Sequence, residues 1–156
     1  MKIMEFLSEQ AVVCHLAATE KEEVIAELVA VLHRAGEIKE KDAPKLKEVL
    51  LNREALGSTG IGQGVAIPHG KNNCVSRLVA AFGVSQQGVD FGSLDGEPAH
   101  LFFLLVAPED SAGPHLKALA RISRLLKDKF FRDALRQAKD ERTLLKIIRD
   151  EDQSRH

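Results

Sequence analysis

The sequence predicts a single α/β domain in which helices flank a mixed, mostly parallel central sheet. Amphipathic segments occupy both ends of the chain, and two apolar runs lie between them. Helices at both ends with strands between them are typical of helices packed on a buried sheet. At 156 residues the chain is large enough for one hydrophobic core. We expect the domain to span residues 1–156, with a frayed tail from about residue 150.

The first part of the chain predicts two helices. Thr19 and Glu22 have the spacing of a capping box, and Gly36 suits the end of the helix that follows. A second amphipathic segment starts near Asp42 and ends at Gly57. The apolar positions at helical spacing are Val24, Ile25, Leu28, Val29 and Leu32 in the first segment, and Leu46, Val49, Leu50 and Leu56 in the second.

Two buried strands are predicted in the middle of the chain. Residues 78–84 have the composition of a buried strand. Residues 101–106 are nearly all apolar, which predicts a strand covered on both faces. Turn residues at 94–98 separate the two runs.

The last third of the chain predicts a loop and three helical segments. Residues 108–114 are expected to form the loop, and a helix is expected to begin at His115. Further helical segments are expected at 130–138 and 141–149. The inner positions expected for the helix that begins at His115 are Leu116, Leu119, Ala120, Ile122, Leu125 and Leu126.

Composition and charge exclude several classes of protein. A formal net charge of -1 and the absence of Trp and Tyr argue against nucleic-acid binding. Cys14 and Cys74 form no CxxC motif, so we expect free thiols in a reducing compartment. The N-terminus reaches Glu5 too early for a signal peptide, and the apolar run 99–107 is too short to cross a bilayer. These features predict a cytoplasmic protein with no direct membrane insertion.

The stretch GSTGIGQGVAIPHGK, residues 57–71, suits neither an ordinary helix nor an ordinary strand. One interpretation is a nucleotide-binding loop, but the required patterns are missing. Five residues separate Gly64 from Gly70, where a Walker A motif has four, and Asn72 stands in place of the final hydroxyl. The glycines of the stretch also lack the spacing and the flanking strand–helix unit of a dinucleotide fingerprint.

A second interpretation is a turn-rich loop with an incidental histidine, and a third makes His69 a nucleophile. Pro68 fixes its own φ and biases Ile67 toward an extended backbone, so His69 follows a stiff segment. Neutral imidazole is nucleophilic near pH 7 and can hold a phosphoryl group as a phosphoramidate. Backbone amides, the hydroxyls of Ser58 and Thr59, and a guanidinium could donate to the phosphoryl oxygens.

The same residues carry a family resemblance. Residues 53–54 (Arg-Glu), 57–62 (Gly-Ser-Thr-Gly-Ile-Gly) and 66–70 (Ala-Ile-Pro-His-Gly) resemble the signature of fructose/mannitol-type IIA domains of the bacterial phosphoenolpyruvate-dependent phosphotransferase system. The resemblance covers nearly the whole chain, including Pro-His-Leu at 114–116. The run 57–71 is most similar to the nitrogen-regulatory IIA proteins.

The resemblance implies a role for each of three residues. His69 would accept a phosphoryl group at Nε2, and Arg53 would neutralise charge beside the phosphohistidine. His115 matches the second active-site histidine of the family and would donate a hydrogen bond or orient His69. Independently, Pro114 suits the first turn of a helix and Ser111 is a candidate cap, which places His115 near a helix N-terminus that favours anions.

The resemblance also implies partners and leaves two functions open. The phosphoryl donor would be the histidine phosphocarrier protein HPr or its nitrogen-branch paralogue. In one function, phosphorylation of His69 switches the affinity of a regulatory module for its target proteins. In the other, a sugar-transport component passes the phosphate to a cysteine of a IIB protein. A brief protein contact needs an exposed apolar rim, and Ile61, Val65 and Leu116 are the candidates.

No cofactor or metal is expected. A zinc site built from His69, His115 and Cys74 is conceivable, but no short ligand spacing supports it. His100 precedes a buried strand and is expected to be structural. The remaining histidines have no supporting neighbours in the sequence: His15, His33 and His156.

Overall fold

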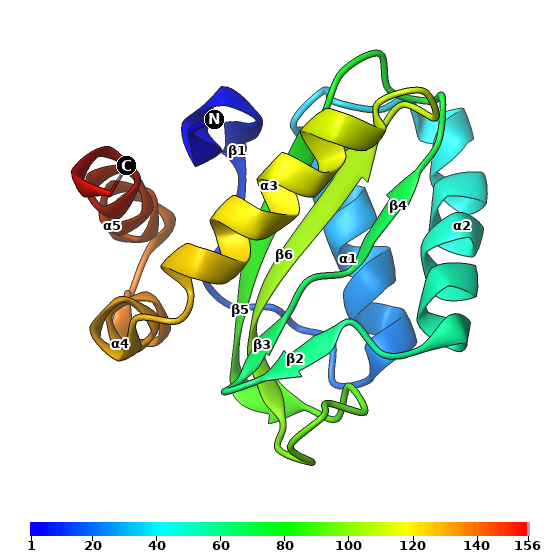
Figure 1. Cartoon of the computed structure of the whole chain (residues 1–156). Coiled ribbons are helices and arrows are strands. Elements are labelled where there is room, and N and C mark those ends of the chain that lie inside the picture. The colour runs from blue at the N-terminus through cyan, green and yellow to red at the C-terminus, as the bar shows by residue number, and fades with distance from the viewer. Residues whose placement is uncertain (156) are drawn as a thin grey trace.

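Helices cover both faces of a six-stranded sheet in the computed structural model, which describes residues 1–155 (Figure 1). The elements in chain order are the short 3-10 helix η1 (Ile3–Glu5), β1 (Leu7–Val13), α1 (Lys21–Arg34), the 3-10 helix η2 (Glu40–Asp42), α2 (Ala43–Leu56), β2 (Gly60–Gly62), β3 (Val65–Ala66), β4 (His69–Lys71), β5 (Val79–Val89), β6 (Ala99–Ala107), α3 (Ala112–Leu125), α4 (Lys129–Gln137) and α5 (Glu141–Ser154).

The sheet is mixed, as predicted. Its strand order is β1-β5-β6-β3-β2, and β4 also pairs with β6. The pairings of β1 with β5 and of β3 and β4 with β6 are parallel, whereas β2 with β3 and β5 with β6 are antiparallel. Along β6, Leu101 lies opposite Val65 of β3 and Leu105 lies opposite His69 of β4. The two short strands therefore follow one another along the same side of β6.

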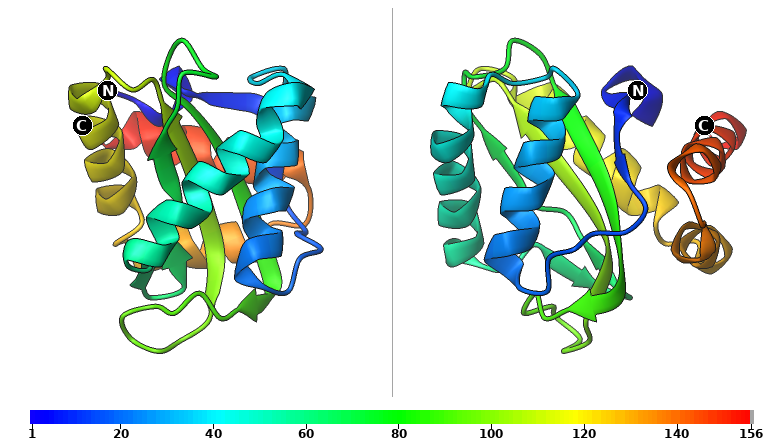
Figure 2. Two further views of the ribbon diagram at one scale, coloured as in Figure 1. Left: turned by 90° about the vertical axis from the view of Figure 1, so that its right-hand side faces the viewer. Right: turned by 180° about the vertical axis from the view of Figure 1, so that it is seen from behind.

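The core forms two layers, one on each face of the sheet. Helices α1 and α2 cover one face, and α3, α4 and α5 cover the other (Figures 1 and 2). Phe82 and Phe103 pack together toward α3, with ring centroids 4.7 Å apart, while their neighbours Ala81 and Phe102 point toward α1 and α2. This alternation confirms that the central strands are covered on both faces. None of the helices described within residues 1–155 is long and apolar enough to cross a membrane.

The predicted helix ends are partly confirmed. The residue preceding α1 is Glu20, which makes no side-chain cap bond. The capping box at Thr19 is therefore wrong, because the helix begins one residue later than the spacing required. Gly36 does end this helix, with a φ of 79° that glycine tolerates best and an amide that donates to the His33 carbonyl at 3.0 Å.

Helix α3 begins at Ala112, so residues 112–114 belong to the helix and the predicted loop is too long. The buried stripe of α3 consists of His115, Ala118, Arg121, Ile122 and Leu125. Leu116 is 67% exposed and Ala120 is also exposed, so both were wrongly placed on the inner side. The buried positions repeat every three to four residues from His115, which turns Leu116 to the outside.

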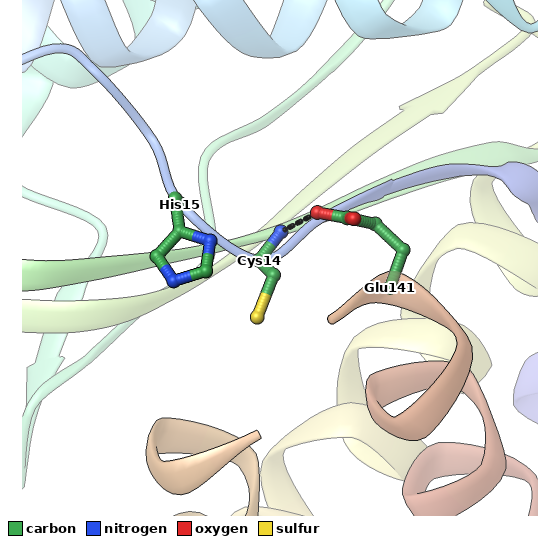
Figure 3. Close-up of side chains that lie close together, drawn as sticks. All are labelled: Cys14, His15 and Glu141. Atoms are coloured by element: carbon green, nitrogen blue, oxygen red, sulfur yellow. Dashed lines mark hydrogen bonds between the residues drawn. The ribbon is translucent and has the colours of Figure 1, made fainter. Parts of the chain in front are cut away.

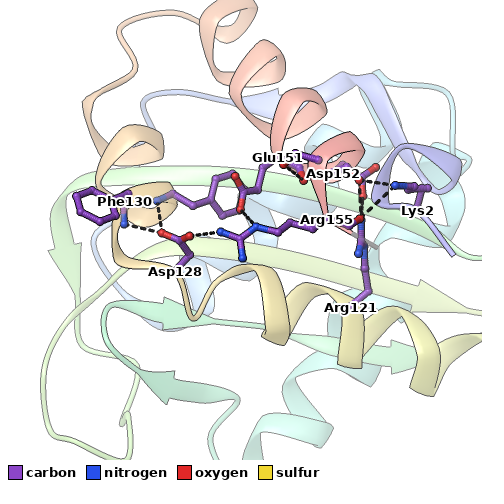
Figure 4. A network of polar contacts seen from close by, with 9 residues as sticks. Lys2, Arg121, Asp128, Phe130, Glu151, Asp152 and Arg155 are labelled. Atoms are coloured by element: carbon purple, nitrogen blue, oxygen red, sulfur yellow. Dashed lines mark hydrogen bonds and ion pairs between the residues drawn. The ribbon is translucent and has the colours of Figure 1, made fainter.

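The C-terminal segment is packed rather than frayed, which corrects the predicted tail from residue 150. Helix α5 runs to Ser154, and Asp152 is 1% exposed. Its carboxylate pairs with Arg121 of α3 at 2.9 Å (Figure 4). It also accepts hydrogen bonds from the amides of Ile3 and Met4. Lys2 Nζ donates to the Asp152 carbonyl at 2.8 Å, so the two chain ends lie side by side. His156 lies outside the described residues.

Candidate functional site

The glycine-rich stretch forms three short strands rather than a free loop. Val65–Ala66, expected to be strand-like, is β3, and His69 begins β4. Pro68 lies between the two strands, and its carbonyl accepts from the Leu105 amide of β6 at 2.9 Å. The Ile67 amide donates to the Thr59 carbonyl at 3.0 Å. Hydrogen bonds on both sides therefore hold the residues directly before His69.

The His69 ring is fixed in one tautomer. Its Nδ1 lies 2.6 Å from the Ile67 carbonyl oxygen, and because a carbonyl oxygen can only accept, Nδ1 carries the proton. The half-buried ring then presents Nε2 with its lone pair free. Burial lowers the pKa of His69 below its ordinary value of 6.5, against the opposing effect of the Ile67 hydrogen bond. The imidazole is thus neutral near pH 7.

His115 lies beside His69, as the resemblance implied. The ring centroids are 5.4 Å apart and the planes meet at 80°. His115 is 4% exposed, and its Nδ1 makes no hydrogen bond within the described residues. Burial lowers the pKa of His115 from 6.5 to about 4, and the nearby His69 and Lys71 contribute in the same direction. Both rings of the pair are therefore neutral at pH 7.

A histidine with a lowered pKa makes stability depend on pH. The unfolded chain binds a proton at His115 near pH 6.5, whereas the folded chain binds it only near pH 4. The stabilising contribution is therefore complete above pH 6.5 and is lost as the pH falls toward 4. We expect the free energy of unfolding to drop by about 2–3 kcal/mol through His115 between pH 7 and pH 4. Urea titrations at both pH values check this, with His115→Gln as comparison; equal pH dependence in the two proteins contradicts it.

Arg53 also reaches the site. It lies in the last turn of α2, and its Nη1 donates to the Gly57 carbonyl at 2.7 Å. Its charge contributes to the lowered pKa of His69, after the larger effect of burial. The guanidinium keeps further N–H donors beside the pocket that His69 lines.

Ser58 and Thr59 do not reach the site, and the expected phosphate contacts are not supported. Ser58 Oγ donates to the Phe91 carbonyl and accepts from the Gly60 amide at 2.9 Å. Thr59 is 4% exposed, and its hydroxyl donates to the carboxylate of Glu54. Both hydroxyls thus stabilise the turn that leads into β2, and neither lines the pocket at His69.

An open, largely apolar pocket of about 660 Å³ surrounds the two histidines. Of the predicted rim residues Leu116 lines it, whereas Val65 is 1% exposed in the core and Ile61 lies elsewhere on the surface. Leu56, assigned to the inner side of its helix in the sequence, is instead 86% exposed at the rim. The complete lining is Val49, Asn52, Arg53, Leu56, His69, Gly70, Lys71, Ala112, His115, Leu116 and Leu119.

Gly70 allows α2 to pack directly against the strand that carries His69. A Cβ atom at this position would lie 3.2 Å from Val49 Cγ1 and 3.4 Å from Leu50 Cδ2. A larger residue would crowd these two side chains of α2, the helix that also carries Arg53. The glycine directly after His69 thus permits the close packing of α2, and Arg53 on this helix lines the same pocket as His69.

A different cluster joins β1 to the C-terminal helices. Within residues 1–155, the group of three potential metal ligands that comes together is Cys14, His15 and Glu141, with ligand atoms within 4.8 Å (Figure 3). The Cys14 thiol donates to the Ala138 carbonyl at 2.8 Å, and its amide donates to Glu141 at 2.7 Å. Burial, with Glu141 and Asp140, raises the pKa of this thiol, so it stays protonated as a donor. These bonds fasten the end of β1 to the connection between α4 and α5.

Two other sequence expectations can be placed. Cys74 lies outside this cluster, and among residues 1–155 neither His69 nor His115 belongs to such a group of three. The Nδ1 atom of His100 lies 2.8 Å from the Ser85 carbonyl, which joins β6 to β5 and supports the expected structural role.

Glu54 and Lys71 were missed in the sequence. The Arg-Glu pair at 53–54 was a signal for Glu54, and no signal singled out Lys71.

Known proteins resemble this chain in sequence and in fold. A fructose-specific EIIABC component from Bacillus subtilis is 45% identical over 152 residues, which cover 97% of this chain but only 24% of that protein. A nitrogen regulatory protein from Bradyrhizobium diazoefficiens is 38% identical over 148 residues, 95% of each chain. Among solved structures, the nitrogen regulatory protein IIA-Ntr of Neisseria meningitidis matches with a TM-score of 0.83 and 32% identity, over 92% of this chain and 97% of that one.

The family model described as "Phosphoenolpyruvate-dependent sugar phosphotransferase system, EIIA 2" matches residues 5–151. The match spans the sheet, both helical layers and the two histidines of the pocket. The chain therefore belongs to the EIIA type-2 family of the phosphoenolpyruvate-dependent sugar phosphotransferase system.

Proposed function

We propose that this protein is a phosphoryl carrier and regulatory protein of the phosphotransferase system, with His69 as the residue that accepts the phosphoryl group. The donor is the phosphorylated histidine protein HPr or its nitrogen-branch paralogue, and the role places the protein in the cytoplasm. The observation that carries the proposal is the hydrogen bond between His69 Nδ1 and the Ile67 carbonyl, 2.6 Å long. That bond leaves Nε2 as the free nucleophile in an open pocket.

The transfer step follows from this tautomer. The Nε2 lone pair of His69 attacks the phosphorus of the carrier phosphohistidine and forms a P–N bond. The P–N bond to the carrier breaks, and its electron pair returns to the carrier ring, which leaves as neutral imidazole because its other ring nitrogen is protonated. The proton stays on Nδ1 throughout the transfer, hydrogen-bonded to the Ile67 carbonyl. The phosphorylated ring therefore carries a positive charge, which keeps the phosphoryl group reactive.

The surroundings of His69 support such a transfer. The guanidinium of Arg53 supplies positive charge and directed N–H donors for the phosphoryl oxygens. His115 is neutral, so it can donate a hydrogen bond without repelling a charged neighbour. The exposed side chains of Leu56 and Leu116 at the rim suit a brief contact with a carrier protein.

One experiment tests the donor and the acceptor together. The protein is incubated with phosphoenolpyruvate, enzyme I and each carrier protein in turn, and is then examined by mass spectrometry under conditions that preserve phosphohistidine. We expect the mass to rise by one phosphoryl group, located on the peptide that contains His69. Absence of the modification with both carriers, or its location on another peptide, would contradict the proposal.

Replacing Arg53 by lysine is expected to slow transfer about 10- to 100-fold, because lysine keeps the charge but loses the planar fork of donors. Rapid-quench measurement of phosphohistidine formation provides the rate. The matched control is Arg142→Lys on the exposed surface of α5, which should leave the rate unchanged. A wild-type rate in Arg53→Lys would show that its guanidinium makes no directed contact in the transition state.

A transport role is the second candidate, because the fructose-specific relative has the higher sequence identity of those compared above. In that role the phosphoryl group moves from His69 to a cysteine of a IIB protein. Incubating the phosphorylated protein with IIB candidates and following loss of the His69 modification separates the two functions. Rapid transfer to a IIB cysteine favours transport. Binding of target proteins by only one phosphorylation state favours regulation.

A further inference from the structure

The carboxylate of Glu54 is buried one residue away from Arg53 but outside the pocket. Its side chain is 3% exposed, and it forms an ion pair of 2.9 Å with Lys21, the first residue of α1. A buried carboxylate is retained only where several donors compensate for the lost hydration. The partners of Glu54 therefore indicate what the buried charge holds in place.

Those partners fix the turn that precedes β2. The Thr59 amide lies 3.2 Å from both carboxylate oxygens of Glu54, and the Thr59 hydroxyl also donates to it. Lys21, which neutralises the carboxylate, lies 4.7 Å from the centre of the Phe91 ring. The adjacent Ser58 hydroxyl donates to the Phe91 carbonyl. Glu54 thus ties Thr59 to two helices at once, α1 through Lys21 and α2 through its own backbone.

Hydrogen bonds continue from Thr59 to the imidazole. The Thr59 carbonyl accepts from the Ile67 amide at 3.0 Å, and the Ile67 carbonyl accepts from His69 Nδ1 at 2.6 Å. Glu54, Thr59, Ile67 and His69 therefore form one series in which each member fixes the next. The series ends on the ring nitrogen whose proton decides the tautomer of His69.

We propose that Glu54 is a positioning residue for phosphoryl transfer, which sets the tautomer and ring orientation of His69 through Thr59 and Ile67. The proposal rests on the proposed function of His69 as phosphoryl acceptor. Without the carboxylate, Thr59 loses its anchor and the Ile67 carbonyl is free to move away from Nδ1. The proton then distributes between the two ring nitrogens, and a smaller fraction of the molecules presents a free Nε2. A displacement of this kind slows a positioned reaction by roughly 100-fold or less.

The test compares Glu54→Gln with the matched variant Glu48→Gln, an exposed glutamate of the same helix whose side chain is 59% exposed. The first readout is the pair of 15N chemical shifts of the His69 ring, which report the tautomer and need no phosphoryl donor. We expect a single Nδ1-protonated form in the wild type and in Glu48→Gln, and a mixture of tautomers in Glu54→Gln. The second readout is the rate of phosphohistidine formation, expected to fall about 10-fold or more in Glu54→Gln.

Unchanged ring shifts in Glu54→Gln would overturn the proposal, even if the variant were less stable or slower. If Glu54→Gln does not fold, Thr59→Val provides the same measurement, because it removes only the hydroxyl and keeps the amide bond to Glu54. Thr59→Val is expected to change the ring shifts in the same direction but less. Failure of the wild type to accept phosphate would contradict the proposed function. The tautomer measurement would still decide whether Glu54 positions the His69 ring.

Discussion

Replacing His69 by alanine is expected to abolish phosphoryl uptake completely. In the proposed reaction a covalent bond forms at Nε2 of His69, and the second histidine of the pocket, His115, is poorly placed to replace it. His115 is 4% exposed, and its pKa is lowered to about 4, so it is a weaker base in a more enclosed position. The measurement is the transfer of radioactive phosphate from the phosphorylated carrier to the protein. The label on the wild-type protein should be labile in acid and stable in base, as a phosphoramidate is.

His33→Ala serves as the control, because His33 is an exposed histidine on α1, outside the pocket. It should take up label at the wild-type rate. His115→Ala should retain labelling at a reduced rate, because it removes the neighbour of His69 and leaves the acceptor intact. Labelling of His69→Ala by the phosphorylated carrier would show that another residue accepts the phosphate.

Breaking the buried ion pair between Arg121 and Asp152 is expected to cost about 3–5 kcal/mol of stability, because either single substitution leaves the other charge buried without its partner. The side chains are 4% and 2% exposed. Arg121 also donates to the carbonyls of Asp152 and Arg155, at 2.7 and 2.8 Å. The pair thus joins α3 to both ends of the chain. Urea unfolding of Arg121→Met and Asp152→Asn measures the loss.

A double-mutant cycle sharpens this prediction. The double variant Arg121→Met/Asp152→Asn leaves no unpaired buried charge, so it should be more stable than the sum of the two single losses implies. The control is Lys146→Met, which breaks an exposed pair with Asp150 on α5 and should change stability by about 1 kcal/mol or less. Strict additivity of the two buried substitutions would mean that the charges do not interact.

The elements with strong local patterns were predictable from the sequence. The two apolar central strands and the amphipathic helices were found because their burial follows a period that the sequence displays. Strand β1 was missed, since its residues 8–10 are polar and at most partly buried, and the register against β5 shifts between Leu7 and Val12. The strand is buried by its pairing with β5 and by packing against α1 and α5, and none of these long-range contacts is visible in the local sequence.

The site residues that belong to a sequence motif were predictable. The contacts made by residues far apart in the sequence were not. The motif identified His69, Arg53 and His115, and the fold brings all three to one pocket. The direction of the Ser58 and Thr59 hydroxyls was not predictable. It depends on the Phe91 carbonyl and on the carboxylate of Glu54, which approach the turn only in the folded chain. The role of Asp152 was hidden for the same reason, because its partners Arg121 and Ile3 are far away in the sequence.

The two edges of the sheet have a consequence for solubility. An edge strand with a long row of unpaired backbone groups recruits strands from other molecules and starts aggregation. Here one edge is made of β2, only three residues long with a glycine at each end, and of the equally short β4, which pairs with β6. The other edge is β1, which is interrupted by its register shift and carries Glu9, paired with Arg149 of α5. Neither edge offers a straight template, so the protein can expose the apolar rim of its pocket to partners without exposing an edge that adds strands.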